Sequence, residues 1–168
     1  MASGHGEKRE MVLLLTGFLS YRALRGRRDD LGLMLRPDEA ERLAELEAVF
    51  GVDSDVSQPI LLPRLHERFP VRLPLEFRRA DGLPCEGTLL NLSTHGFFVA
   101  TSHTRTPGER LTFRFVDHGA GREWQFAGEV AQARGGDRSG MGLRFVGIPL
   151  EVHHTRPPTS GDRLSVAA

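Results

Sequence analysis

Residues 88–100 read Thr-Leu-Leu-Asn-Leu-Ser-Thr-His-Gly-Phe-Phe-Val-Ala, a polar stretch between two apolar runs. This pattern predicts a strand, a tight turn over residues 91–96 and a second strand. Asn and Ser side chains can hydrogen-bond to nearby backbone groups and so hold such a turn. Gly96 would supply either a backbone conformation with positive φ or a bare surface on which a flat group can rest. By itself the stretch indicates only a turn, and its role depends on the residues around it.

Short strand patterns surround this turn. Apolar and polar residues alternate from Phe69 to Arg78, and Asp81-Gly82 is a strong hairpin signal. Six short strands predict a mainly β fold, a closed six-stranded antiparallel barrel, because closure removes exposed sheet edges. The strands are expected at residues 69–78, 85–92, 96–101, 110–116, 123–133 and 141–146. Their aromatic residues are expected in the core or at its rim: Phe113, Phe115, Trp124, Phe126 and Phe145.

Two arginines, Arg64 and Arg68, precede the first strand with the spacing RxxxR. Together with the N-x-S-x-x-G turn, this spacing resembles the PilZ domain family, whose members bind the bacterial second messenger cyclic di-GMP. The resemblance covers residues 63–150 and includes Pro107-Gly108 and the closing run at residues 140–145. It implies a PilZ-type barrel and a bacterial cyclic di-GMP receptor or effector that regulates motility, polysaccharide or biofilm.

The resemblance also implies which residues would bind the nucleotide: Arg64, Arg68, Asn91, Ser93 and Gly96. An arginine guanidinium matches the O6 and N7 acceptors of guanine with two parallel donors, and it also pairs with phosphate oxygens. Asn91 and Ser93 would bond a guanine through their amide and hydroxyl groups. Gly96 would let the base approach the backbone.

The alternative is a PilZ-like adaptor that acts through protein contacts without binding nucleotide. Leu65 stands where many family members have a second arginine, and Glu67 adds a negative charge close to the expected phosphate position. Both features favour the adaptor, which would need no change of fold.

The overall charge is balanced, so any anion site must be local. The 168 residues include 22 basic and 22 acidic residues, and 39% are hydrophobic. No global field would therefore draw the chain to nucleic acid or to an anionic membrane. Residues 63–79 carry five Arg against two Glu, a balance of +3, whereas residues 1–62 carry eight basic and eleven acidic residues, a balance of −3.

Neither an enzyme nor a metal or cofactor site is expected. Ser93 could be paired with His66 or His95 as nucleophile and base, but the sequence has no G-x-S-x-G elbow and no phosphate loop. The single cysteine, Cys85, has no disulfide partner and no metal ligands at a useful spacing, which favours a cytoplasmic protein.

The N-terminal part predicts two helices. The apolar run from Met11 to Leu24 is interrupted by Tyr21-Arg22 and is too short to span a bilayer, which takes about twenty apolar residues. Its apolar face would contain Met11, Leu14, Leu15, Phe18 and Leu19. A second helix should open at Arg36-Pro37-Asp38-Glu39 and end at Gly51. Its apolar face would contain Leu43, Leu46, Val49 and Phe50.

These signals divide the chain into a helical hairpin at residues 1–51, a linker at 52–63, the PilZ barrel at 64–150 and a flexible tail at 151–168. Residues 1–10 are expected to fray. The hairpin is too small to be stable alone. Covering by a protein partner or a second copy is slightly favoured over packing on its own barrel. If the hairpin packs on its own barrel, it would cover the face that a helix after the last strand usually covers in PilZ domains.

Overall fold

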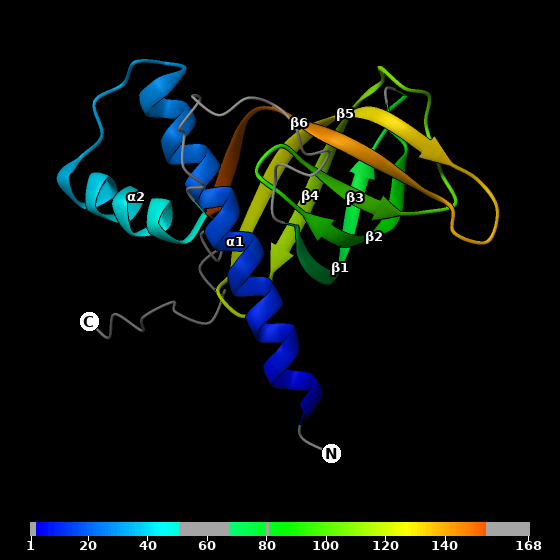
Figure 1. The fold of residues 1–168 in the computed structure, drawn as a ribbon, viewed down its shortest axis with the longest axis horizontal. Helices are drawn as coiled ribbons and strands as arrows, with labels where there is room; N and C mark the ends of the chain where they lie inside the picture. The colour runs from blue at the N-terminus through cyan, green and yellow to red at the C-terminus, as the bar shows by residue number, and fades with distance from the viewer. Residues whose placement is uncertain (1–2, 51–67, 80, 154–168) are drawn as a thin grey trace, which may run out of the picture.

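The computed structural model describes residues 3–50, 68–79 and 81–153, in which two helices precede six strands (Figure 1). The helices are α1 (Ser3–Asp29) and α2 (Pro37–Phe50). The strands are β1 (Phe69–Arg78), β2 (Pro84–Leu92), β3 (Gly96–Ala100), β4 (Arg110–Asp117), β5 (Arg122–Arg134) and β6 (Gly140–His153).

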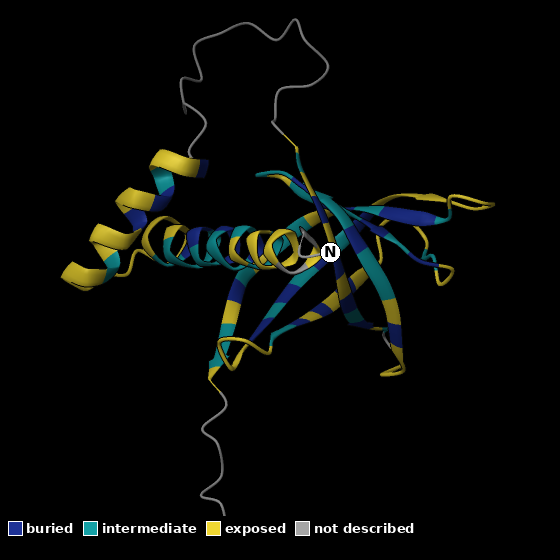
Figure 2. Cartoon of the chain, turned by 90° about the horizontal axis from the view of Figure 1, so that it is seen from below, coloured by how far each residue is buried: buried dark blue, intermediate teal, exposed yellow. Residues whose placement is uncertain are grey.

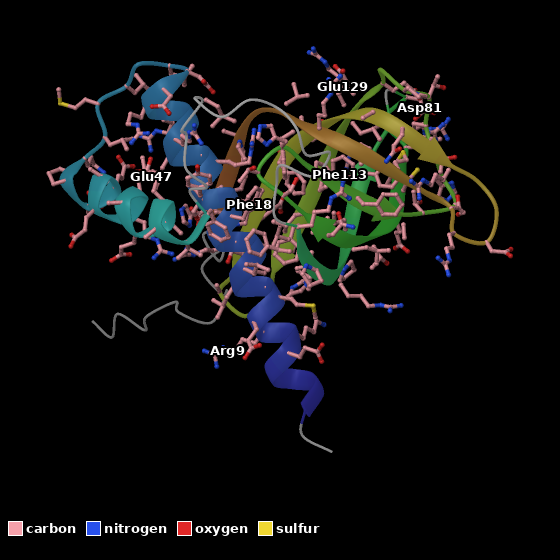
Figure 3. The ribbon with its side chains drawn as sticks, in the orientation of Figure 1. Arg9, Phe18, Glu47, Asp81, Phe113 and Glu129 are labelled. Atoms are coloured by element: carbon pink, nitrogen blue, oxygen red, sulfur yellow. The ribbon has the colours of Figure 1, made fainter. Side chains whose placement is uncertain are left out.

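The strands form a closed antiparallel barrel in the order β1-β2-β3-β6-β5-β4, with β4 pairing back onto β1. This confirms the fold predicted from the sequence. Alternate residues of β1 point into the barrel and are buried: Val71, Leu73, Leu75 and Phe77. Phe113 lies inside the barrel (Figure 3), where its ring stacks on that of Phe126 with centroids 5.5 Å apart. The aromatic residues expected in the core are buried, except that Phe145 is only partly buried.

β6 is longer than the sequence predicted. The last strand was expected at residues 141–146, but the described strand continues through Gly147, which has a φ of 69° and lies at an irregularity in the pairing with β5. Pairing resumes at Leu150, opposite Gln125, and continues to His153. Residues 147–149 of β6 stand opposite one residue of β5, so β6 has two extra residues here. Such an enlarged β-bulge bends a strand rather than ending it. Residues 151–153 therefore belong to β6 and not to a tail, while residues 154–168 lie outside the described part of the chain.

The helices differ from the prediction at two points. α1 begins at Ser3, so the expected fraying of residues 1–10 is wrong from Ser3 onward. Val49 was expected on the apolar face of α2, but it is 65% exposed. The other three expected residues of that face, Leu43, Leu46 and Phe50, are buried. Neither α1 nor α2, the two helices of the described residues, combines the length and apolar content that crossing a membrane requires.

The apolar face of α1 packs on the barrel of its own chain, against β6 and β1 (Figures 1 and 2). Phe18 is fully buried, and its ring lies 5.4 Å from that of Phe50 on α2 and 5.5 Å from that of Phe145 on β6. At Gly26 the helix comes so close to β6 that an added Cβ would lie 2.8 Å from the Ile148 side chain. The hairpin thus covers one face of the barrel in cis, and this face of α1 needs no partner to bury it.

Candidate functional site

Ser93 and Gly96 close the turn between β2 and β3 through their own hydrogen bonds. The Ser93 amide donates to the Gly96 carbonyl oxygen over 2.7 Å, and the Ser93 hydroxyl donates to the same oxygen over 3.2 Å. The Gly96 amide in turn lies 3.3 Å from Ser93 Oγ, which accepts from it. The predicted turn is therefore present, and the serine hydroxyl already bonds within it.

Gly96 is required for a reason that the sequence did not indicate. Gly96 is absent from the described glycines with positive φ, so the first of its two expected roles is wrong. Gly96 pairs with Arg144 on β6, and a Cβ at Gly96 would collide with the carbonyl oxygen of Leu143. A side chain here would push β3 away from β6.

Asn91 lies at the end of β2, between Pro70 of β1 and Phe98 of β3. Its side chain is half-buried and forms no hydrogen bond with the other described residues. The pairing of β2 is irregular on both sides at this point, between Pro70 and Leu73 and between Leu89 and Asn91. The Asn91 amide is thus held at an irregular strand end, and its hydrogen-bonding groups have no partner within residues 3–50, 68–79 and 81–153.

Arg68 lies beside this turn because of the strand register. Phe69 pairs with Leu92, so Arg68, one residue before Phe69, is next to the backbone that leads from Leu92 into Ser93. Arg68 is exposed and has no carboxylate partner within the described residues. The structure therefore brings Arg68, Asn91, Ser93 and Gly96 to one end of the barrel. Arg64 lies outside the described residues.

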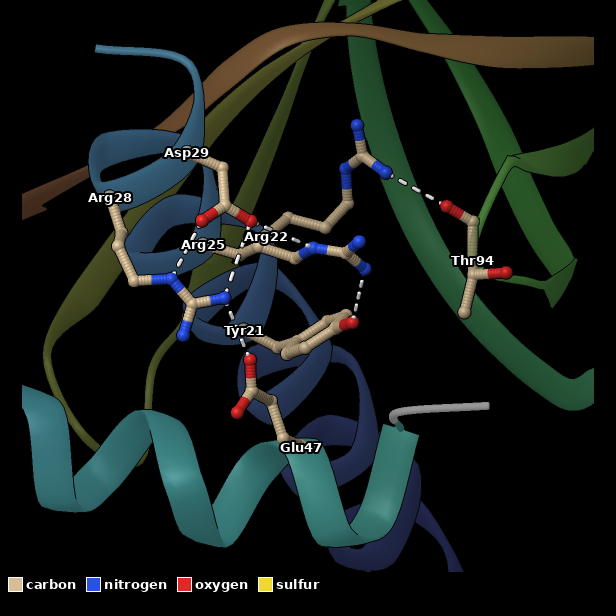
Figure 4. Close-up of polar contacts among 7 residues, drawn as sticks. All are labelled: Tyr21, Arg22, Arg25, Arg28, Asp29, Glu47 and Thr94. Atoms are coloured by element: carbon tan, nitrogen blue, oxygen red, sulfur yellow. Dashed lines mark hydrogen bonds and ion pairs between the residues drawn. The ribbon is translucent and has the colours of Figure 1, made fainter. Parts of the chain in front are cut away.

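Arg22, on α1, contacts the same turn and was not among the predicted site residues. Its Nη1 donates to the carbonyl oxygen of Thr94 over 2.8 Å (Figure 4). Its guanidinium carbon lies 4.5 Å from the centroid of the Phe145 ring. Its Nε is buried without a hydrogen-bond partner in the described part of the chain. Burial lowers the pKa of the Arg22 guanidinium, and the neighbouring charge of Arg25 lowers it further. The sequence indicates only that Arg22 shares the buried face of Phe18, which it follows by four residues.

A comparison with models of protein families matches residues 63–155 to the PilZ domain, which is more than half of the chain. This chain belongs to the PilZ domain family. The matched region includes both sequence motifs on which the resemblance rested, and the match continues to residue 155, beyond the boundary expected at 150.

Solved PilZ structures resemble the chain over about half its length. The PilZ domain of CeSA from a cellulose-synthesizing bacterium is 24% identical, with 48% of this chain and 81% of that chain covered and a TM-score of 0.39. The PilZ domain of YcgR from Escherichia coli, solved with c-di-GMP, is 15% identical, with coverages of 51% and 79% and a TM-score of 0.41. The Bacillus subtilis inhibitor of motility MotI/DgrA is 16% identical, with coverages of 52% and 44% and a TM-score of 0.42. No curated protein matches the chain significantly.

Other arginines of α1 and the barrel are engaged with carboxylates. Arg144, opposite Gly96, lies 2.8 Å from Glu129, and Arg28 on α1 lies 2.7 Å from Asp29. The hydrogen bond from Arg28 is the main reason that the pKa of Asp29 is lowered. Arg22 and Arg68, by contrast, have no carboxylate within ion-pair distance in residues 3–50, 68–79 and 81–153. The same residues contain no group of three His, Cys, Asp or Glu side chains that could hold a metal ion.

Proposed function

We propose that this PilZ domain binds cyclic di-GMP at the barrel end formed by Arg68, Asn91 and Ser93. The observation that carries the proposal is the pairing of Phe69 with Leu92, which puts Arg68 next to the N-x-S-x-x-G turn. The Arg68 guanidinium and the Asn91 amide have no partner among the described residues, so neither must break a described contact to bind a ligand.

The chemistry of these groups suits a guanine dinucleotide. Cyclic di-GMP has two guanine bases and two phosphates, and an arginine can contact either with paired donors. The Asn91 amide offers both a donor and an acceptor to a base edge. Arg64, four residues before Arg68, would supply a second guanidinium from the entry segment. Each good bidentate contact is worth about 1–3 kcal/mol of discrimination.

The proposed output is a change in protein contacts and not a chemical reaction. Residues 57–68 connect the helical hairpin to β1 and include Arg64 and Arg68. Ligand that engages both arginines would fix this connection and change how the hairpin contacts a protein partner or a second copy of the chain. Through such a contact a bacterial receptor would regulate motility, polysaccharide or biofilm. An adaptor that works without nucleotide is the second candidate.

Calorimetric titration of cyclic di-GMP into the full chain separates these two functions. We expect saturable binding to the wild type in the micromolar range or tighter, and no binding of GTP. Arg68→Ala should weaken the affinity about tenfold or more, since one bidentate contact is lost. Arg78→Ala, at the opposite end of β1 and exposed, is the matched control and should bind like the wild type. If the folded wild type binds no cyclic di-GMP, the remaining candidate function is the adaptor that works without nucleotide.

A further inference from the structure

We propose that Arg22 is a positioning residue of the nucleotide site, through which ligand binding at the turn and docking of α1 on the barrel stabilise one another. The inference rests on the proposed function and adds to it a residue from the N-terminal helix, outside both sequence motifs. Arg22 reaches the turn in space although it is 72 residues away from Thr94 in sequence.

The backbone of the turn is held from two sides at successive residues. The Thr94 carbonyl, between Ser93 and Gly96, accepts the hydrogen bond from Arg22, and the His95 carbonyl accepts one from the Phe145 amide over 3.1 Å. The ring of the same Phe145 lies under the Arg22 guanidinium. α1 and β6 therefore fix the turn jointly, and α1 does so through one side chain.

Arginine is a costly choice for packing alone. A partly buried guanidinium loses hydration, and this cost is recovered through its hydrogen bonds, its charge partners and its contact with an aromatic ring. Arg22 has no carboxylate within ion-pair distance in the described residues, and its Nε is buried without a partner there. An apolar side chain would cover Phe145 at lower cost. Compared with an apolar side chain, the arginine adds the hydrogen bond to the Thr94 carbonyl and the cation–π contact with Phe145.

The neighbouring arginines of α1 show the contrast. Arg25 bonds to Tyr21 and Asp29 of its own helix, and Arg28 bonds to Asp29 and to Glu47 of α2 (Figure 4). Those contacts remain within the hairpin. Arg22 joins the hairpin to the turn that contains Ser93 and Gly96, so the position of α1 and the conformation of the turn depend on each other.

This dependence has a thermodynamic consequence. If ligand prefers the turn as Arg22 holds it, ligand must also stabilise α1 on the barrel, and α1 must raise the affinity for ligand by the same factor. Ligand bound at the turn would then affect the hairpin directly, in addition to any effect through residues 57–68.

The test compares Arg22→Met, Arg22→Lys and Arg25→Ala with the wild type. Methionine keeps an unbranched apolar chain over Phe145 but removes the donor, whereas lysine keeps a charged donor. Affinity for cyclic di-GMP is measured by calorimetry, and protection of α1 amides by hydrogen exchange with and without ligand. We expect Arg22→Met to bind at least about fivefold more weakly, the lower end of typical coupling between sites. Arg22→Lys should be affected less, and Arg25→Ala should match the wild type.

Hydrogen exchange distinguishes coupling from a loss of general stability. Ligand should increase α1 protection in the wild type and in Arg25→Ala, and this increase should disappear in Arg22→Met. If Arg22→Met does not fold, the same comparison is made with Arg22→Lys, where a reduced increase is expected. If Arg22→Met binds cyclic di-GMP with wild-type affinity and ligand still increases its α1 protection, the inference about Arg22 is overturned while the proposed function stands. Tighter binding by Arg22→Met would have the same consequence. A wild type that binds no cyclic di-GMP would overturn the proposed function and this inference with it.

Discussion

Individual residues of the turn have different structural roles. Ser93 and Gly96 hold the turn and the approach of β3 to β6, whereas the Asn91 side chain has no such structural bond among the described residues. The sequence predicted the turn because Asn, Ser and Gly at this spacing favour one. It could not predict why Gly96 is glycine, because the Leu143 carbonyl that excludes a side chain is 47 residues away in sequence and reaches Gly96 only through strand pairing.

Gly96→Ala should destabilise the barrel by roughly 1–3 kcal/mol, since the added methyl group meets a backbone atom that can move only with its strand. Chemical denaturation measures the free energy of unfolding. Gly135→Ala is the control, because it has open space and no positive φ, and a stability equal to or slightly above wild type is expected there. An equal effect of both variants would contradict the close contact with Leu143.

Asn91→Ala and Ser93→Ala should separate binding from folding. Asn91→Ala removes an amide without a described partner, so its unfolding free energy should stay within about 0.5 kcal/mol of wild type while cyclic di-GMP affinity falls about tenfold. Ser93→Ala should lose about 1 kcal/mol of stability as well, because its hydroxyl bonds within the turn. Denaturation and calorimetry on the same samples give both values. If Asn91→Ala lowers the free energy of unfolding and Ser93→Ala does not, this division of roles is refuted.

At the level of elements, helix ends were predictable where the signal is local. Arg36-Pro37-Asp38-Glu39 predicted the start of α2, and the Glu39 carboxylate indeed accepts a hydrogen bond from the Arg36 amide over 3.0 Å. The bond from Arg27 of α1 to Glu39, 2.7 Å long, could not be predicted, because it depends on how the two helices pack. The end of β6 was not predictable in this way, because the strand continues beyond residue 146 through its pairing with β5, which resumes at Leu150.

Glu39 should make the stability of the hairpin depend on pH. The Arg27 hydrogen bond, followed by that of the Arg36 amide, lowers the pKa of Glu39 below its ordinary value of 4.5. A lowered folded-state pKa stabilises the protein above pH 4.5, and this contribution is lost as the pH falls through the folded-state pKa. Glu39→Gln should therefore be less stable than wild type near neutral pH and similar to it in acid.

Denaturation of Glu39→Gln and wild type at several pH values between neutrality and strong acid checks this. Glu41→Gln is the control, because Glu41 is exposed on the same helix and forms no ion pair with other described residues. A difference between wild type and Glu39→Gln that does not change with pH would argue against the ionised contact with Arg27.

In the whole molecule, hairpin and barrel share one buried cluster that runs from Leu15 and Phe18 of α1 to the barrel interior. Alternation of apolar residues predicted the barrel. The location of the hairpin did not follow from the sequence, because an apolar helix face shows that something covers it without showing what. For the same reason Arg22 could not be assigned to the turn before its position on the barrel was known.

Phe18→Ala should lower the stability of the whole chain by about 3–5 kcal/mol, because it removes a fully buried ring from between α1, α2 and β6. Far-UV circular dichroism reports the helices, and fluorescence of Trp124, the single tryptophan, reports the barrel. In the wild type the two unfolding curves should coincide. Leu13→Ala, at a residue that is 60% exposed, should change little. Two separate transitions in the wild type would mean that the hairpin and barrel do not unfold as one unit.

The most direct test of the account is to follow backbone amide signals of the isotope-labelled full chain by NMR while cyclic di-GMP is added. The largest shifts are predicted at residues 68–69 and 91–96, with further shifts on α1 around Arg22. Unchanged spectra from a folded protein, or largest shifts at the distant β5–β6 turn at residues 135–139, would contradict a nucleotide site at this end of the barrel.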